Sequence, residues 1–423
     1  MRLTQLFRLT LIATMIGVLL PVVPKTGAPA RRQGVVLKAQ ASTSALTGSL
    51  DTYSLFLPLV GKSYSNKYLG VFLPLTEQST WTTEMDQFIS LVGISHGVYL
   101  TSSGFDCSWV DSVSDIQQYL DYTYAQGATP LITWMPTDCG NGGFGNINVL
   151  SLPNILDGSW DAYMTQWAAG IAALGYPVFV RWGHEMNIPS YSWAGQHAFG
   201  SDGRTDYDQV PGSSCGANPL KGCYGNSNLY DGPERYIDAY RHVHDLVAPI
   251  APNIVWVWNP NGLDWPRSST NPWNGYNNYY PGDTYVDWIG VDGYNWGQQS
   301  GNGYSFVWAT FDDIYRNVFD DLASRHPAKP QMIPELATVE DEMDPNRKAN
   351  WIHDAYQSAY NNYPLLHVVS WENEVFWDAA WSPTGSPYNV TGHWADFRVN
   401  SSPQALQAYQ DAIVLWISSA PLR

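Results

Sequence analysis

The sequence predicts a single (β/α)8 barrel, or TIM barrel, which belongs to the α/β class. Three observations support this fold. The 423 residues are a common length for one such barrel. Short apolar runs alternate with longer segments of helical periodicity. Polar and aromatic residues gather at the carboxyl ends of several runs, and in a barrel those ends line one mouth.

The apolar runs are predicted to be parallel β-strands, because they are nearly continuous and such strands are buried on both faces. Segments with helical periodicity follow them, for example residues 233–250 and 346–363. An open, doubly wound sheet is the alternative. Such sheets usually carry a glycine-rich phosphate-binding turn after the first strand, and none is present there. The eight runs are residues 68–74, 95–103, 129–136, 177–187, 253–261, 285–296, 329–337 and 365–374.

The composition favours a globular protein that meets a neutral ligand. Hydrophobic residues make up 44% of the chain and charged residues only 14%, against about a quarter in typical domains. The 20 Trp and 27 Tyr residues either stack on sugars or pack a large core. The net charge is −17, so the chain repels phosphate backbones and nucleic acid is not an expected partner.

The N-terminus is predicted to be a secretion signal. Arg2 and Arg8 precede an apolar run, Leu9–Val23, as in signal peptides. The alternative is an uncleaved membrane anchor. The run is shorter than the roughly 20 residues of a membrane span, and Pro21 interrupts it. We therefore expect a secreted, extracellular protein that makes no membrane contact after the signal is removed.

These features divide the sequence into three parts. Residues 1–30 are the predicted signal peptide, with a second set of small residues that places cleavage as late as residue 41. Residues 42–66 are rich in Ser, Thr and Gly and form a linker or an irregular lead-in. Residues 67–415 are the predicted catalytic barrel. Nothing domain-sized remains outside it, and a monomer is expected.

Four cysteines lie in the exported part of the sequence. An even number in an exported chain suggests disulfides. Of the three possible connectivities, the local one is simplest: Cys107–Cys139 and Cys215–Cys223. A zinc site would need paired cysteines at CxxC spacing or histidines nearby, and neither pattern occurs. The sequence therefore predicts no metal site and no cofactor.

Two glutamates are the candidate catalytic residues. Glu185 ends the fourth run, in VRWGHEMN, and Glu335 ends the seventh, in MIPELA. The ends of strands four and seven face each other across a barrel mouth, so both carboxyl groups can reach one bond. Hydrolysis of a glycosidic bond needs such a pair. A lone buried glutamate is more often part of an ion pair, but two at strand ends favour catalysis.

The segments around these glutamates resemble glycoside hydrolase family 26, over most of residues 68 to 415. The resemblance is carried by VRWGHEMN, YVDWIGVDGYNWG, IPELA and VSWENE. The family is known for β-mannanases, with some mixed-linkage β-glucanases and β-1,3-xylanases. The resemblance implies a retaining endo-β-glycanase, with Glu185 as acid/base, Glu335 as nucleophile and β-1,4-mannan as the first substrate to consider.

The same resemblance suggests residues that contact the substrate. Tyr294 looks like the family's tyrosine that hydrogen-bonds the nucleophile, and Trp371 looks like the platform under the sugar at the cleavage site. His184 is expected to hydrogen-bond the sugar or to orient a carboxylate. Trp182, Tyr191 and Trp193 could form apolar walls that raise the pKa of Glu185.

Three further residues complete the predicted site. Trp134 ends the third run and is expected to contact the sugar. Mannanases of the family often have a histidine near this point, and LITWMPTDCG has none, which weakens the case for mannose. Arg181 either holds a carboxylate or forms a barrel salt bridge. Asp292 either supports the site or belongs to the barrel interior.

Other functions remain open at this point. On the same site, mixed-linkage β-1,3-1,4-glucan or β-1,3-xylan could replace mannan. A non-catalytic carbohydrate-binding barrel and a transglycosylase are further alternatives. Acyl hydrolysis has little support, because no GxSxG elbow occurs. The long segment 196–232 after the fourth run either shapes the substrate site or is a surface excursion. In each case the expected partner is a polysaccharide.

Overall fold

The computed structural model describes residues 67–73, 80–106, 111–138, 152–195, 231–297, 299–301, 304–341, 343–377 and 394–417. All of them belong to one compact unit, Ser54–Arg423. The predicted signal peptide, the segment 42–66 and all four cysteines lie outside the described residues. None of the helices in the described part combines the length and hydrophobicity of a membrane-spanning helix.

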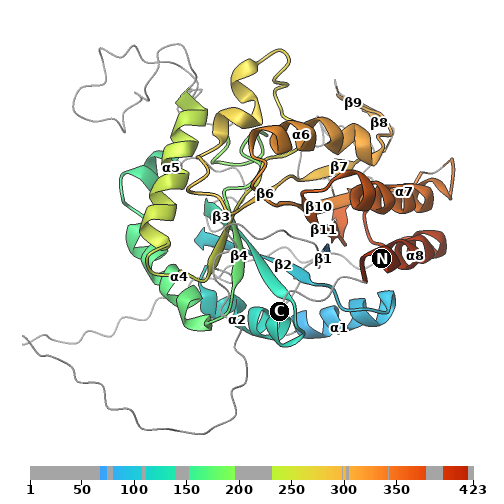
Figure 1. Ribbon diagram of the computed structural model, residues 1–423, viewed down its shortest axis with the longest axis horizontal. Helices are drawn as coiled ribbons and strands as arrows, with labels where there is room; N and C mark the ends of the chain where they lie inside the picture. The colour runs from blue at the N-terminus through green and yellow to red at the C-terminus, as the bar shows by residue number, and fades with distance from the viewer. Residues whose placement is uncertain are drawn as a thin grey trace, which may run out of the picture. The chain divides into compact units, whose positions relative to one another are not determined.

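Eight parallel strands close into a barrel, as the sequence predicts. Each pairs with the next in chain order, and the eighth pairs with the first, Val368 opposite Tyr68. Figure 1 shows the strands at the centre with the helices around them. The strands are β1 (Tyr68–Phe72), β2 (Val98–Asp106), β3 (Thr129–Asp138), β4 (Val178–Trp182), β5 (Ile254–Trp258), β6 (Trp288–Gly290), β10 (Gln331–Thr338) and β11 (Leu366–Glu372).

Amphipathic helices cover the outside of the barrel. They begin and end where local sequence dictates: α6 starts at a capping box between Thr310 and Asp313, and α1 stops at Gly93, whose φ is +87°. The helices are α1 (Trp81–Val92), α2 (Val113–Ala125), α3 (Leu152–Leu156), α4 (Asp161–Leu174), α5 (Asp231–Val247), α6 (Phe311–Arg325), α7 (Arg347–Asn362) and α8 (Pro403–Ile417).

Several short elements lie in the loops at the mouth of the barrel. They are the 3-10 helices η3 (Pro272–Asn274) and η4 (Tyr276–Tyr279), the hairpin of β8 (Gln299–Gly301) with β9 (Tyr304–Phe306), and the hairpin of β12 (Val375–Trp377) with β13 (Trp394–Asp396). A further short strand, β7 (Gly293–Asn295), continues the line of β6 and pairs with β10.

The barrel interior changes from apolar to polar along the strands. A closed apolar layer fills it, contributed by strand residues alone: Tyr68, Val98, Leu100, Leu131, Phe179, Val257, Trp288, Met332 and Val368. Side chains two positions further along a strand point to the same side. Here these include Thr133, Arg181, Asn259 and Ser370, all buried. A polar layer therefore lies directly above the apolar layer, toward the carboxyl ends.

Two glycines make room for this polar layer. A Cβ atom at Gly70 would lie 1.9 Å from Oγ of Ser370, and one at Gly290 would lie 2.3 Å from Oδ1 of Asn259. Real Cβ atoms do not approach other atoms so closely, so glycine is needed at both positions. The interior is thus packed around its polar groups.

Trp134 and Trp371 face the helices, which corrects the prediction that they contact a sugar. Trp134 stacks on Trp167 of α4, with ring centroids 3.8 Å apart and an interplanar angle of 8°. Trp371 packs against Tyr356 of α7 and Tyr409 of α8, and its Nε1 donates to the carbonyl of Phe397 at 2.7 Å. Both side chains are 0% exposed, so neither ring offers a surface for stacking.

We expect Trp134→Ala to lower the free energy of unfolding by about 3–5 kcal/mol, because the change leaves a large cavity beside Trp167. Equilibrium urea unfolding measures the effect. Met343→Ala is the control, since Met343 is 94% exposed and its loss should change the free energy by less than about 0.5 kcal/mol. Equal stability of the two variants would contradict the core position of Trp134.

Candidate active site

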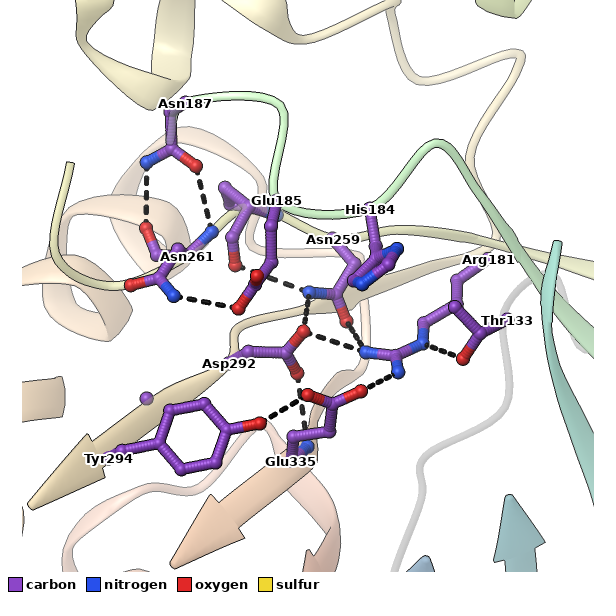
Figure 2. A network of polar contacts seen from close by, with 12 residues as sticks. Thr133, Arg181, His184, Glu185, Asn187, Asn259, Asn261, Asp292, Tyr294 and Glu335 are labelled. Carbon is purple, nitrogen blue, oxygen red and sulfur yellow. Dashed lines mark hydrogen bonds and ion pairs between the residues drawn. The ribbon is translucent and has the colours of Figure 1, made fainter. Parts of the chain in front are cut away.

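Arg181 lies at the centre of the polar layer and joins several strands. Its Nε donates to Oγ1 of Thr133 at 2.7 Å, and its Nη1 donates to Oδ2 of Asp292 at 2.7 Å. Its Nη2 donates to Oε1 of Glu335. Figure 2 shows the guanidinium between the two carboxylates. The side chain is 1% exposed, so these contacts form away from water and are not weakened by it.

Asp292 accepts hydrogen bonds on both of its oxygens. In addition to Arg181, Oδ2 accepts from Nδ2 of Asn259 at 2.8 Å, and Oδ1 accepts from the backbone N–H of Glu335 at 3.0 Å. Three N–H donors suit an ionised carboxylate, which can only accept. The structure therefore assigns Arg181 and Asp292 to one buried ion pair that supports Glu335.

A β-bulge in β10 turns Glu335 into the barrel mouth. Met332 pairs with Gly290 and Leu336 with Gly293, so β10 has one residue more than its neighbour. The same excess occurs opposite β11. Ile333 faces the helices, and strict alternation would send Glu335 the same way. The bulge re-aims it, and Pro334, which lacks an N–H, is compatible with that position.

Glu335 is held as a carboxylate. Tyr294 donates from its hydroxyl to Oε2, while Arg181 donates to Oε1. Burial alone would raise the pKa of Glu335, but the charge of Arg181 and the hydrogen bond from Tyr294 outweigh it and lower that pKa. The side chain keeps 14% exposure. The predicted contact between Tyr294 and the proposed nucleophile is present.

Glu185 follows β4 in a tight turn. Gly183 and Glu185 have φ angles of +55° and +53°, and the second is uncommon for a residue with a side chain. The backbone N–H of Glu185 donates to the carbonyl of Asn259 at 2.7 Å, which fixes this conformation. Strained backbone of this kind is often found at functional sites.

The side chain of Glu185 holds its proton to a higher pH than an ordinary glutamate does. It is 4% exposed, and its Oε1 accepts from Nδ2 of Asn261 at 2.7 Å. Burial, followed by the negative charge of Glu335, raises the pKa of Glu185 to about 7. Two neighbouring glutamates thus have opposite pKa shifts, which is how a site separates an acid from a nucleophile.

The two carboxyl groups lie close together. Oxygen atoms of Glu185, Asp292 and Glu335 fall within 4.8 Å of one another. Retaining glycosidases separate their two carboxyl groups by about 5–5.5 Å, whereas inverting enzymes need about 6.5–9.5 Å. By spacing alone the three acids could also hold a cation. Arg181 already supplies the counter-charge to Asp292 and Glu335, so the arrangement fits an ion pair.

His184, Tyr191 and Trp193 form one aromatic wall beside Glu185. The Tyr191 and Trp193 rings stack with centroids 4.5 Å apart, and the His184 ring lies 4.9 Å from Tyr191. Nε1 of Trp193 donates to the carbonyl of His184 at 2.7 Å. Trp193 is 1% exposed and serves as packing behind Tyr191. Trp182 instead faces Tyr236 and Tyr240 of α5.

His184 is neutral, and one of its ring nitrogens is buried without a partner among the described residues. Burial, helped by the charge of Arg181, lowers its pKa to about 3. Its Nδ1 is buried and has no hydrogen-bond partner among the described residues. A buried polar atom without a partner is costly. The contact of His184 with a sugar stays a prediction.

Sequence reasoning missed the asparagines that position Glu185. Nδ2 of Asn187 donates to the carbonyl of Asn261 at 2.8 Å, and the N–H of Asn261 donates back to Oδ1 of Asn187 at 2.9 Å. This reciprocal pair holds the side chain of Asn261 on Glu185 (Figure 2). Asn187 lies in HEMN and Asn261 in NPNG, yet nothing in those segments marks the two as partners.

Glu372 is a further acid of the site. It ends β11 two positions after the inward-facing Ser370, so it points into the mouth. Burial, the charge of Glu335 and the neighbouring Glu374 raise the pKa of Glu372. The negative charge of Glu335 therefore disfavours the ionisation of Glu372.

Comparison with known sequences finds two curated relatives, and no protein-family model matches. Endoglucanase H of Acetivibrio thermocellus is 31% identical over 309 residues, which cover 72% of this chain and 26% of that protein. A β-1,3-xylanase of an Alcaligenes species is 22% identical over 62% of this chain and 48% of that protein. The chain thus spans between a quarter and a half of the length of these relatives.

Comparison with solved structures identifies the fold. The catalytic domain of a family 26 endo-β-1,4-mannanase from Bacillus sp. JAMB-750 has a TM-score of 0.54 and 15% identity, over 84% of this chain and 88% of that one. A family 26 mannanase from Cellulomonas fimi has a TM-score of 0.50 and 14% identity, over 84% and 71%. These homologues and neighbours are glycoside hydrolases. The predicted barrel and its likeness to family 26 are confirmed.

We expect the pKa of Glu185 to fall below about 7 in a Glu335→Gln variant, because the substitution removes the nearby negative charge. Titration of carbon-13-labelled glutamate side chains by NMR measures the shift. Asp354→Asn, which removes a distant and 80% exposed carboxylate, is the control and should leave this pKa unchanged. A pKa that stays near 7 in Glu335→Gln would show that Glu335 does not influence Glu185.

Proposed function

We propose that this chain, which has the fold of glycoside hydrolase family 26, cleaves a β-linked polysaccharide internally and retains the anomeric configuration. One observation carries the proposal: two glutamates with oxygens within 4.8 Å of each other have pKa values shifted in opposite directions. That combination provides an acid and a nucleophile for one glycosidic bond.

In the first step Glu335 acts as the nucleophile and Glu185 as the acid. A carboxylate oxygen of Glu335 forms a bond to the anomeric carbon as the bond from that carbon to the leaving oxygen breaks. Glu185 gives its proton to that oxygen, so the leaving sugar departs neutral. The product of the step is a covalent glycosyl-enzyme.

In the second step Glu185 changes role. Once Glu335 is an ester it carries no charge, and the repulsion that raises the pKa of Glu185 is lost. Glu185, now ionised, takes a proton from water while the water oxygen attacks the anomeric carbon. The ester bond breaks and Glu335 returns to its carboxylate form, where Arg181 and Tyr294 bind it again.

For the substrate we place a β-glucan ahead of β-1,4-mannan, which reverses the order taken from the sequence. The relative that is 31% identical is named an endoglucanase. The two mannanase structures compared above are 15% and 14% identical. The missing histidine in LITWMPTDCG also supports glucan. Mannan and β-1,3-xylan are the second and third candidates.

We also propose that the enzyme is exported and acts as a monomer on an extracellular polysaccharide. The basic start and the apolar run Leu9–Val23 support export. The low content of charged residues and the net charge of −17 support a neutral polymer as the partner and disfavour nucleic acid.

The first test is reducing-sugar release from barley β-glucan, glucomannan, galactomannan and β-1,3-xylan. We expect release from barley β-glucan, and a loss of at least about 10³-fold in Glu335→Ala, because the nucleophile is absent. The first-formed product, followed by proton NMR, should have the β configuration. Release from mannans alone would keep the mechanism and change the substrate. An α product, or full activity in Glu335→Ala, would contradict the mechanism.

The pH profile of kcat/KM should be bell-shaped, because activity needs Glu185 protonated and Glu335 ionised. The rate should fall as the pH rises through about 7, where Glu185 loses its proton. It should fall on the acid side only below the usual pKa of a glutamate, where Glu335 gains a proton. Tyr294→Phe removes a hydrogen bond to Glu335 and should move the acid limb to higher pH; an unmoved limb would contradict this assignment.

A further inference from the structure

An endo-acting enzyme must hold sugars on both sides of the bond it breaks. The leaving sugar lies on the side of the acid, here Glu185. Most tryptophans of the described residues are packed into the protein, including Trp134, Trp193 and Trp371. Trp265 differs from these three, because its side chain is 42% exposed.

Trp265 lies next to the turn that carries Glu185. Its backbone N–H donates to the carbonyl of Asn187 at 2.9 Å, two residues after the acid. Nδ2 of Asn274 in η3 donates both to that carbonyl, at 2.9 Å, and to the carbonyl of Pro266, at 2.8 Å. The backbone of Trp265 is therefore held at a fixed place beside the turn of the acid, and its side chain is exposed.

The same loop also positions the acid itself. Asn261, four residues before Trp265, donates to Oε1 of Glu185, and its backbone exchanges hydrogen bonds with the side chain of Asn187 (Figure 2). The loop that follows β5 thus carries a contact to the proton donor and an exposed aromatic ring. This pairing suits a loop that receives the sugar to which the proton is given.

We infer that Trp265 is the platform on which the leaving-group sugar stacks, on the reducing-end side of the cleaved bond. The inference rests on the proposed function and extends it by assigning a residue to the leaving-group side. An indole presents a broad, flat apolar surface with a polar edge, which matches the apolar face of a β-linked pyranose. In this arrangement Trp265 contacts the leaving-group sugar, whereas Glu335 binds the sugar on the other side of the cleaved bond.

The test compares two substrates that differ only in the leaving group. One is a β-glucan oligosaccharide, whose leaving group is a sugar. The other is a fluoride of the same glycosyl part, whose leaving group has no surface to stack. In Trp265→Ala we expect kcat/KM on the oligosaccharide to fall about tenfold, which corresponds to about 1.4 kcal/mol. With the fluoride it should stay unchanged, and Trp265→Phe should recover part of the loss.

Tyr124→Ala is the matched control. Tyr124 is also an exposed aromatic residue, at 50%, but it stacks on Tyr176 just before β4 begins, at the other end of the barrel. It should leave both rates unchanged. The free energy of unfolding is measured for both variants, so that a lower rate in Trp265→Ala is separated from a loss of folded protein.

Two results would overturn the inference: an unchanged rate on the oligosaccharide in Trp265→Ala, or an equal loss on both substrates. The second would mean that the residue only maintains the site. A wild-type protein that cleaves neither substrate, nor any polysaccharide of the panel, would instead remove the proposed function. Added acceptor sugar provides a further readout, since Trp265→Ala should form less transglycosylation product relative to hydrolysis than the wild type.

Discussion

The buried ion pair of Arg181 with Asp292 and Glu335 is the constraint on which the rest of the site depends. A cation with two carboxylates in the barrel interior is stable only while every charge keeps its partners, and removal of one partner leaves an uncompensated buried charge. The guanidinium therefore does more than hold Glu335 in place. It also keeps Glu335 negatively charged, and that charge, within 4.8 Å of the second acid Glu185, contributes to raising the pKa of Glu185 to about 7.

The charges of the site form one system rather than a set of separate groups. Arg181 lowers the pKa of Glu335, the resulting negative charge raises that of Glu185, and Arg181 also lowers the pKa of His184. A change at one residue is transmitted to the others through space, since burial reduces the screening by water. Coupled groups of this kind titrate together.

The barrel fold and the two candidate catalytic glutamates could be predicted from the sequence, because both depend on where a residue lies along a strand. The prediction was wrong about the side of the strand, barrel axis or surrounding helices, to which Trp134 and Trp371 point. At four strand ends a polar residue adjoins a tryptophan: Thr133–Trp134, Arg181–Trp182, Trp258–Asn259 and Ser370–Trp371. In each case the polar residue faces the barrel axis and the tryptophan the helices. This alternation was visible in the sequence. The bulge at Glu335 was not, because it appears only in the strand pairing.

The attachment of the backbone N–H groups of Glu185 and Glu335 to residues at the strand ends has a consequence for how such proteins diversify. Glu185 is fixed by the carbonyl of Asn259, and Glu335 by a bulge anchored on Asp292. Both anchors lie where strands of the barrel end: Asn259 directly follows β5, and Asp292 lies between β6 and β7. A loop that carries neither anchor can be exchanged or lengthened by evolution, or replaced by a protein engineer, while these two contacts stay in place. New polysaccharide preferences can then arise without any new chemistry.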